Sequence, residues 1–266
     1  MRREEVKDGE SPYLFLPLPV QVEMDESTVK HLLIAGARGV AKSYGSRWHL
    51  YKRCAKIPGY TALLLRCTYD ELNKNHLQFM AAESQQIGAT YKGGNVREMS
   101  FPNSSTIFAG YCDDQSDVKR HVGNEWDEVV FEEAVHFLPL AINEISVSAR
   151  GSKTARPAKE ALGITGGRTR LQSNPGGRAM LYLQDFYISK TPDQEEYPTY
   201  QAAHYGFISS TLDDNPYLAE DYEETTLSHL TAARYKQWRH GDWSVYAGAF
   251  FGAFDSQKHL QQLDMA

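Results

Sequence analysis

The chain alternates between short apolar runs and longer segments in which apolar residues recur at helical spacing. The runs at 32–35, 61–67 and 129–131 are bounded by polar residues or turns, which is typical of strands buried in a parallel sheet. Further strands are expected at 168–173 and 204–209, and helices at 42–56, 68–88, 135–149 and 217–238. This alternation predicts an α/β fold with a mostly parallel sheet flanked by helices.

Two segments depart from this alternation. Polar and apolar residues alternate over 96–101 and 105–111 on either side of a Pro-Asn-Ser turn, which predicts a β-hairpin. Residues 1–30 are predicted to be irregular, because their prolines forbid a regular helix. Their aromatic and apolar side chains either cover a nucleotide base, with Gln21 as an amide contact, or pack against the core.

The strongest chemical pattern lies between the first predicted strand and helix. It consists of Gly36, Ala37, Arg38, Gly39, Val40, Ala41, Lys42 and Ser43. A glycine-bearing loop at a helix N-terminus presents backbone N–H groups to phosphate, Lys42 would reach the β- and γ-phosphates of ATP, and the Ser43 hydroxyl would bind Mg²⁺. The alternative is an ordinary glycine-containing loop with a surface lysine.

One position of this phosphate-binding loop departs from the usual pattern G-x-x-x-x-G-K-[ST]. Ala41 stands where that pattern has glycine. With right-handed helical dihedrals at this position, alanine would cost little and the loop would still close.

A second chemical pattern ends the apolar run at 129–131. Glu132 and Glu133 follow it directly, and successive side chains of a strand point to opposite faces, so the two acids can have separate tasks. Glu132 would hold Mg²⁺, directly or through water, and Glu133 would orient and polarise the attacking water. The alternative is a solvated acidic strand end. Ser173 and Asn174, at the end of another predicted strand, would lie in the crevice where they could sense the γ-phosphate.

Composition narrows the class of protein. The 266 residues are 41% hydrophobic and 23% charged, and contain neither a membrane-span-length apolar run nor an N-terminal signal-peptide pattern, so a cytoplasmic protein without a membrane partner is expected. The three cysteines and nine histidines form no zinc-binding pattern.

The chain has a net charge of −6, and its charged residues are unevenly distributed along the sequence. Residues 149–178 carry seven basic residues against Glu160 alone, whereas residues 191–230 carry nine acids and no lysine or arginine. The basic residues are Arg150, Lys153, Arg156, Lys159, Arg168, Arg170 and Arg178. This asymmetry indicates either a surface that faces a polyanion or a solvated basic loop.

The ordered set of motifs resembles the ATPase domain of the large terminase subunit, the DNA-packaging motor of tailed bacteriophages. The resemblance covers about residues 10–255. It is carried by GARGVAKS at 36–43, VVFEEA at 129–134, SNP at 173–175, RHGDW at 239–243 and AGAFFGAFD at 247–255.

This resemblance implies a P-loop NTPase fold of the additional-strand, catalytic-glutamate type. It implies an ATPase core at 1–212 with an N-terminal nucleotide-covering segment, a helical lid at 213–245, and a tail at 246–266. Lys42 and Ser43 match the phosphate and Mg²⁺ residues, Glu132 the metal-side acid, Glu133 the catalytic glutamate, and Ser173 and Asn174 the coupling motif. The tail leaves no room for the nuclease domain that follows in such enzymes, so we expect no nuclease activity.

The resemblance also implies an arginine that stabilises transition-state charge. The candidates are Arg38 in the loop, Arg120 before the acidic strand and Arg150 after it. Arg38 ranks first by proximity, and the motif before the acidic strand does not align cleanly because Val122 and Gly123 occupy its neighbourhood. Each of the three arginines could instead be a surface charge.

The expected function is ATP hydrolysis that drives double-stranded DNA into a capsid in the cytoplasm of an infected bacterium. The expected partners are the portal protein, the small terminase subunit and further copies of this chain in a ring, with a monomer in isolation left open. Two alternatives are a helicase or recombination ATPase and a non-catalytic nucleotide-binding scaffold.

Overall fold

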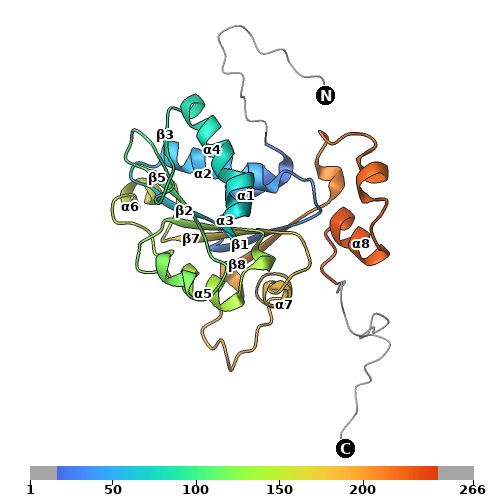
Figure 1. Cartoon of the computed structure of the whole chain (residues 1–266). Coiled ribbons are helices and arrows are strands. Elements are labelled where there is room, and N and C mark those ends of the chain that lie inside the picture. The colour runs from blue at the N-terminus through green and yellow to red at the C-terminus, as the bar shows by residue number, and fades with distance from the viewer. Residues whose placement is uncertain (1–16, 245–266) are drawn as a thin grey trace, which may run out of the picture.

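The computed structural model describes residues 17–244 and contains one eight-stranded sheet with helices on both faces (Figure 1). The strands are β1 (His31–Gly36), β2 (Thr61–Arg66), β3 (Thr90–Lys92), β4 (Glu98–Ser100), β5 (Thr106–Tyr111), β6 (Glu128–Glu132), β7 (Arg168–Ser173) and β8 (Tyr205–Ser210). Their order is β3-β4-β5-β2-β6-β7-β1-β8. The part from β5 to β8 is parallel, whereas β4 is antiparallel to both of its neighbours, β3 and β5.

Strand β7 lies between β1, which leads into the glycine loop, and β6, which carries the acids. In register, Ala35 pairs with Ser173, and Glu132 pairs with Gln172. The carboxyl ends of β1, β7 and β6 therefore lie side by side at one edge of the sheet. An extra strand between the loop strand and the acidic strand is the arrangement that the additional-strand fold requires, so the predicted fold class is confirmed.

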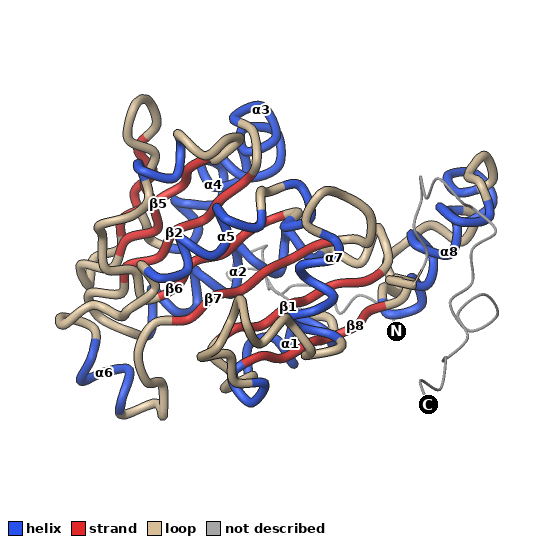
Figure 2. The backbone as a smooth tube through the Cα atoms, turned by 90° about the horizontal axis from the view of Figure 1, so that it is seen from below, coloured by secondary structure: helices blue, strands red, loops and turns tan. Residues whose placement is uncertain are grey.

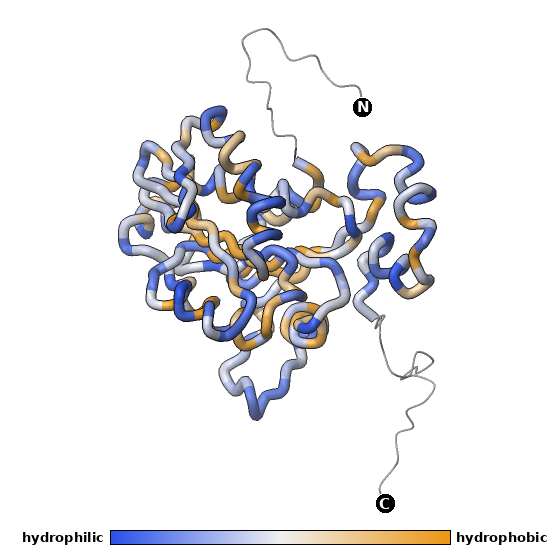
Figure 3. Tube along the Cα trace, in the orientation of Figure 1, coloured by the Kyte–Doolittle hydropathy of each residue, from blue (hydrophilic) through white to orange (hydrophobic). Residues whose placement is uncertain are grey.

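Helices cover both faces of the sheet. The α-helices are α1 (Pro19–Glu26), α2 (Lys42–Lys56), α3 (Tyr69–Leu72), α4 (Gln78–Glu83), α5 (Pro139–Val147), α6 (Arg156–Glu160), α7 (Met180–Leu183) and α8 (Ala232–His240), of which α8 lies beyond the sheet rather than on a face. Helices α2 and α4 lie on one face, and α5 and α7 lie on the other (Figure 1). Successive strand residues point to opposite faces of the sheet and belong to two separate hydrophobic cores. Leu64 packs in the core between the sheet and α2, and Leu65 packs in the core between the sheet and α5. Figure 3 shows the resulting band of hydrophobic residues along the central strands.

Most of the predicted elements are confirmed, but the N-terminal segment, the edge of the sheet and the helix predicted at 217–238 differ. The predicted strands, the hairpin and the helix at 42–56 appear within one or two residues of their expected bounds, and Gly88 ends the helical stretch with a φ of 68°. The prediction of an irregular N-terminal segment was wrong for α1, because Pro19 occupies the first turn, where a helix tolerates proline. The short edge strand β3 was not anticipated.

The segment after β8 packs on the glycine loop. Leu212 and Leu227 form a small apolar cluster with Ala37 and Val40 of the loop. Figure 2 shows this segment, with α8, at the end of β1 and β8. Of the predicted helix at 217–238, the structure contains α8 and a π-helical turn at Glu223–Leu227. We call the helical segment that follows Leu212, through His240, the lid. No helix within residues 17–244 is both long and apolar enough to cross a membrane.

Candidate nucleotide site

The glycine loop joins β1 to the N-terminus of α2, as the sequence predicts, but its backbone differs at one position. Ala41 has φ 54° and ψ 32°, which lies in the left-handed region. The right-handed dihedrals under which alanine would cost little are therefore not present at Ala41. A left-handed backbone costs a residue with a Cβ about 1–2 kcal/mol, which explains why glycine is usual here. The loop closes despite the alanine, with strain stored at the start of α2.

The loop presents unused backbone donors. The N–H group of Ala37 donates to Ser210 O, and that of Arg38 donates to Trp238 O, both at 2.8 Å. Within the described part of the chain, the N–H groups of Gly39, Val40 and Ala41 have no hydrogen-bond acceptor. Successive free N–H groups at the N-terminus of a helix of 15 residues form a site for an anion such as phosphate.

Lys42 is buried beside these donors. Its Nζ atom donates to Ala37 O and to Asn174 Oδ1, each at 2.7 Å. Burial lowers the pKa of Lys42 to about 8, against the opposing effect of the nearby carboxylates of Glu133 and Glu132. An ammonium group has three hydrogens, so one donor remains for a phosphate oxygen.

Glu132 is buried on the α2 side of the site. Its carboxylate accepts hydrogen bonds from Ser43 Oγ at 2.6 Å and from Ser46 Oγ, and His76 Nε2 lies 3.4 Å from it. Burial alone would raise the pKa of Glu132, but His76 and the two serine hydroxyls outweigh it and lower the pKa to about 2. An ionised carboxylate beside a serine hydroxyl fits Mg²⁺, which prefers oxygen ligands and keeps several waters or phosphate oxygens of its own.

Glu133 follows the end of β6 in a strained conformation. Its φ of 53° is left-handed, a backbone that non-glycine residues adopt mainly where the surroundings enforce it. Asn174 Nδ2 donates to Glu133 Oε1 at 3.2 Å, while Asn174 Oδ1 accepts from Lys42. One amide thus joins the lysine of the loop to the second acid of β6.

Glu133 and Asn174, the latter bonded to Lys42, line a small cleft with a volume of about 230 Å³. Its walls include Arg38, Arg66, Glu71, Glu133, Asn174 and Arg234. A cleft below the usual range of about 300–1,000 Å³ for small-molecule pockets suits the phosphate end of a nucleotide rather than the whole molecule.

The lid contacts this cleft directly. The guanidinium of Arg38 lies over the ring of Trp238, 4.3 Å from its centroid, and Asn215 Nδ2 donates to Gly39 O at 2.6 Å. Gly39 has a φ of 87°, and a Cβ there would lie 3.2 Å from the hydroxyl of Tyr222. The positive φ disfavours a side chain at position 39, and the approach of Tyr222 adds to this preference for glycine.

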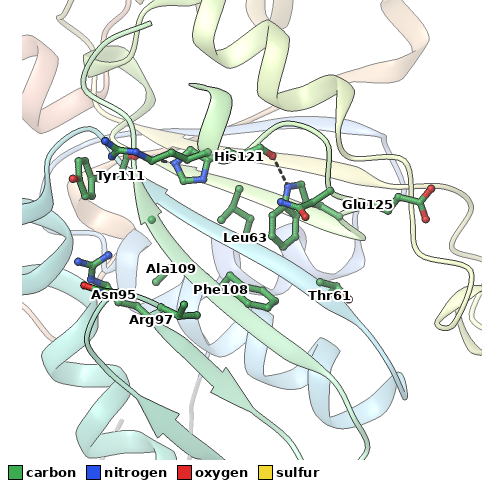
Figure 4. A pocket seen from close by; sticks show the side chains of 14 residues that line it. Thr61, Leu63, Asn95, Arg97, Phe108, Ala109, Tyr111, His121 and Glu125 are labelled. Carbon is green, nitrogen blue, oxygen red and sulfur yellow. Dashed lines mark hydrogen bonds between the residues drawn. The ribbon is translucent and has the colours of Figure 1, made fainter. Parts of the chain in front are cut away.

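The structure brings one of the three candidate arginines to the cleft. Arg38 lines it, whereas Arg120 pairs with Asp117 at 2.9 Å and lines a separate cavity of about 650 Å³. Figure 4 shows that this cavity is built from β2, β5 and the segment around His121, and no residue of the glycine loop lines it. Arg150 donates to Asn124 O, at the amino-terminal end of β6, opposite the acids.

Two further predicted residues are engaged with the protein itself. Gln21 accepts from the N–H group of Leu18 and donates to Ala41 O at 2.9 Å, so its amide holds the loop. Ser173 accepts from the N–H group of Val135 at 3.2 Å and is fully buried. Ser173 therefore fixes the backbone that follows Glu133, and Asn174 carries the direct contacts.

The basic segment at 149–178 is only partly a charged surface. Lys159 pairs with Asp127 at 2.6 Å, Arg170 lies 3.4 Å from Glu128, and both bases are buried. Arg168 is also buried and donates to Ser27 O. The interpretation of the whole segment as a polyanion-facing surface was wrong for these three residues, because internal acids and carbonyl groups hold them inside the protein.

Sequence reasoning missed several residues of the cleft, among them two charged residues near the end of β2 and two residues of the lid. Arg66 and Glu71 belong to the end of β2 and to α3, and Arg234 and Trp238 belong to the lid. Arg66 ends an apolar run that was recognised as a parallel strand, and that position was the available signal. Nothing in the pattern of the lid distinguishes Arg234 and Trp238 from surface residues.

The fold matches those of solved viral ATPases. The large terminase of a thermophilic bacteriophage aligns with a TM-score of 0.66 and 14% identity over 86% of this chain and 54% of that chain. The same protein in complex with ATP-gamma-S gives a TM-score of 0.61 and 14% identity over 85% of this chain and 52% of that chain. The large terminase ATPase domain of Thermus phage P74-26 aligns with a TM-score of 0.56 and 15% identity over 85% of this chain and 93% of that chain.

The present chain thus spans about half the length of the large terminase from the thermophilic bacteriophage. No family model and no curated protein matches the sequence. At these identities the similarity shows a shared fold.

Proposed function

We propose that this chain is the ATP-hydrolysing motor of a viral large terminase, which moves double-stranded DNA into a capsid. The observation that carries the proposal is the convergence of Lys42, Asn174 and Glu133 at the carboxyl edge of the sheet, next to the free N–H groups of the loop. The shared fold with terminase ATPase domains supports the choice of this motor over other P-loop enzymes.

In the proposed reaction, the loop N–H groups and Lys42 bind the β- and γ-phosphates of ATP. Glu133 accepts a proton from a water whose oxygen bonds to the γ-phosphorus. The bond from that phosphorus to the bridging oxygen breaks, the electron pair stays on ADP, and inorganic phosphate leaves. Magnesium, held by Ser43 and Glu132, would neutralise charge on the phosphates when bound.

The coupling to DNA is part of the same proposal. After the internal bases are set aside, Arg150, Lys153, Arg156 and Arg178 remain exposed, and the first three are close together in the sequence. Contacts of this kind bind the DNA backbone without sequence preference and weaken strongly as salt increases. The proposed partners are the portal protein, the small terminase subunit and further copies of this chain in a ring, acting in the cytoplasm of the infected host.

The test is phosphate release from ATP with Mg²⁺, with and without double-stranded DNA, over a range of protein concentrations. We expect turnover that DNA stimulates and that rises with concentration as subunits assemble. Lys42→Ala should abolish nucleotide binding measured by calorimetry, because it removes the buried charge beside the loop. Absence of ATP binding by the wild-type protein would reject the proposal, and separation of a forked duplex would favour a helicase instead.

A further inference from the structure

Arg66 is a buried arginine that the reaction described above does not use. It is the last residue of β2, and its side chain is only 7% exposed. Its Nε and Nη1 atoms are buried without a hydrogen-bond partner in the described part of the chain, where no carboxylate lies within ion-pair distance of it. A buried guanidinium is costly unless it is paired, so this charge indicates a missing anionic partner.

The position of Arg66 identifies where that partner would lie. Arg66 lines the same cleft as Glu133 and Asn174. Leu65 pairs with Phe131, so Arg66 extends one residue beyond that pair, level with Glu132. Because β2 and β1 lie on opposite sides of β6 and β7, Arg66 and the glycine loop approach the cleft from opposite sides.

We propose that Arg66 binds the γ-phosphate of ATP within the same subunit and stabilises the charge that develops on it during hydrolysis. The inference rests on the proposed ATPase function. The loop and Lys42 hold one side of the triphosphate, and Glu133 lies where the attacking water must be. Arg66 and Glu133 line the same cleft, so Arg66 would meet the phosphate that the water attacks, and a guanidinium can donate two parallel hydrogen bonds to its oxygens.

Arg66 differs from the other two arginines of the cleft in how it is held. Arg38 stacks on Trp238 of the lid, and Arg234 belongs to the lid and contacts Gln237. Arg66 is fixed by the parallel sheet, with hydrogen-bonded strands on both sides. Its contact with phosphate would therefore not depend on the position of the lid.

The test compares Arg66→Gln and Arg66→Lys with the control Arg120→Gln. Arg120 is an exposed arginine that pairs with Asp117 at 2.9 Å and does not line the cleft. Calorimetry with Mg²⁺ gives the affinities for ATP-gamma-S and ADP, phosphate release gives kcat, and thermal denaturation reports folding.

For Arg66→Gln we expect a loss of about tenfold or more in ATP-gamma-S affinity, since charge-assisted hydrogen bonds contribute about 1.5–3 kcal/mol, with ADP affinity nearly unchanged. The fall in kcat should approach the range of about 10³–10⁵ known for arginine fingers. Arg66→Lys keeps the positive charge and should retain part of the ATP-gamma-S affinity and part of kcat. It also provides the test if Arg66→Gln does not fold.

Two results would overturn the inference while leaving ATPase function intact. The first is that Arg66→Gln and Arg66→Lys keep the wild-type ratio of ATP-gamma-S to ADP affinity and the wild-type kcat. The second is that both nucleotides lose affinity equally and the melting temperature falls. Failure of the wild-type protein to bind either nucleotide would overturn the proposed function itself, and the role of Arg66 with it.

Discussion

The Nζ atom of Lys42 lies 2.7 Å from Oδ1 of Asn174, although 132 positions separate the two residues in the sequence. The same amide donates to Glu133 through Nδ2. Because an amide has its acceptor and donor on opposite sides, Asn174 holds the lysine and the acid at a fixed separation.

Asn174→Ala removes both hydrogen bonds while leaving the loop in place. We expect kcat for ATP hydrolysis to fall by about tenfold or more, since leaving a buried charged partner unpaired costs about 1–3 kcal/mol. ADP binding should change little. Phosphate release and calorimetry provide the measurements. Asn143→Ala, which loses a hydrogen bond from Tyr182 on the far side of the sheet, is the matched control, and an equal loss there would contradict the assignment.

Glu133→Gln keeps the shape of the side chain and removes its capacity to take a proton. Turnover should fall by about 10²–10⁴-fold, the usual contribution of a general base, while ATP affinity is retained. The control is Glu144→Gln, an exposed acid that accepts a hydrogen bond from Gln115. Retained hydrolysis in Glu133→Gln would show that another group activates the water.

Ala41→Gly and Ala41→Val test the strain in the loop. Glycine relieves the left-handed backbone cost of about 1–2 kcal/mol and loses part of that gain to the greater freedom of the unfolded chain. We expect Ala41→Gly to raise the melting temperature by about 2 °C and β-branched valine to lower it by more than that. Thermal denaturation without nucleotide is the measurement. A lower melting temperature for glycine than for alanine would show that the left-handed backbone is not strained.

His49 predicts a pH dependence of stability. It lies between Asp25 and Glu128, and its Nε2 is 2.9 Å from the Glu128 carboxylate. Burial opposes the charged imidazole, but Glu128 and Asp25 outweigh it and raise the pKa of His49. Burial also opposes the charged form of Asp25, which by itself would raise the pKa of Asp25. His49 and Lys52 outweigh burial and lower this pKa to about 2.

The sign of each effect follows from these directions. The raised pKa of His49 contributes stability that is complete below about pH 6.5 and is lost as pH rises through the raised value. The lowered pKa of Asp25 contributes stability that is complete above about pH 4 and is lost as pH falls toward 2.

Urea denaturation from pH 3 to 9.5 should therefore show that His49→Gln destabilises the protein most between about pH 4 and 6.5. The difference between wild type and variant should narrow toward both ends of the range. A difference that does not change with pH would mean that His49 contributes through packing alone.

The sequence predicted the sheet well because strands buried on both faces leave continuous apolar runs, as in 61–67 and 129–131. It could not predict the backbone of Ala41, because the closure of the loop is imposed by distant residues such as Gln21 and Asn215. It also could not separate Arg66 and Arg170 from surface arginines, since burial of a charge depends on which residues face it across the sheet.

The hydrogen bond from the N–H group of Arg38 to Trp238 O sets a competition. A single amide hydrogen cannot donate at full strength both to that carbonyl and to a phosphate oxygen. An anion that accepts from the N–H group of Arg38 therefore weakens the contact between α8 and the loop. By thermodynamic reciprocity, whatever pulls α8 away leaves the donor free and favours the anion by the same factor. Anion binding to the loop and the position of α8 therefore report on the same equilibrium.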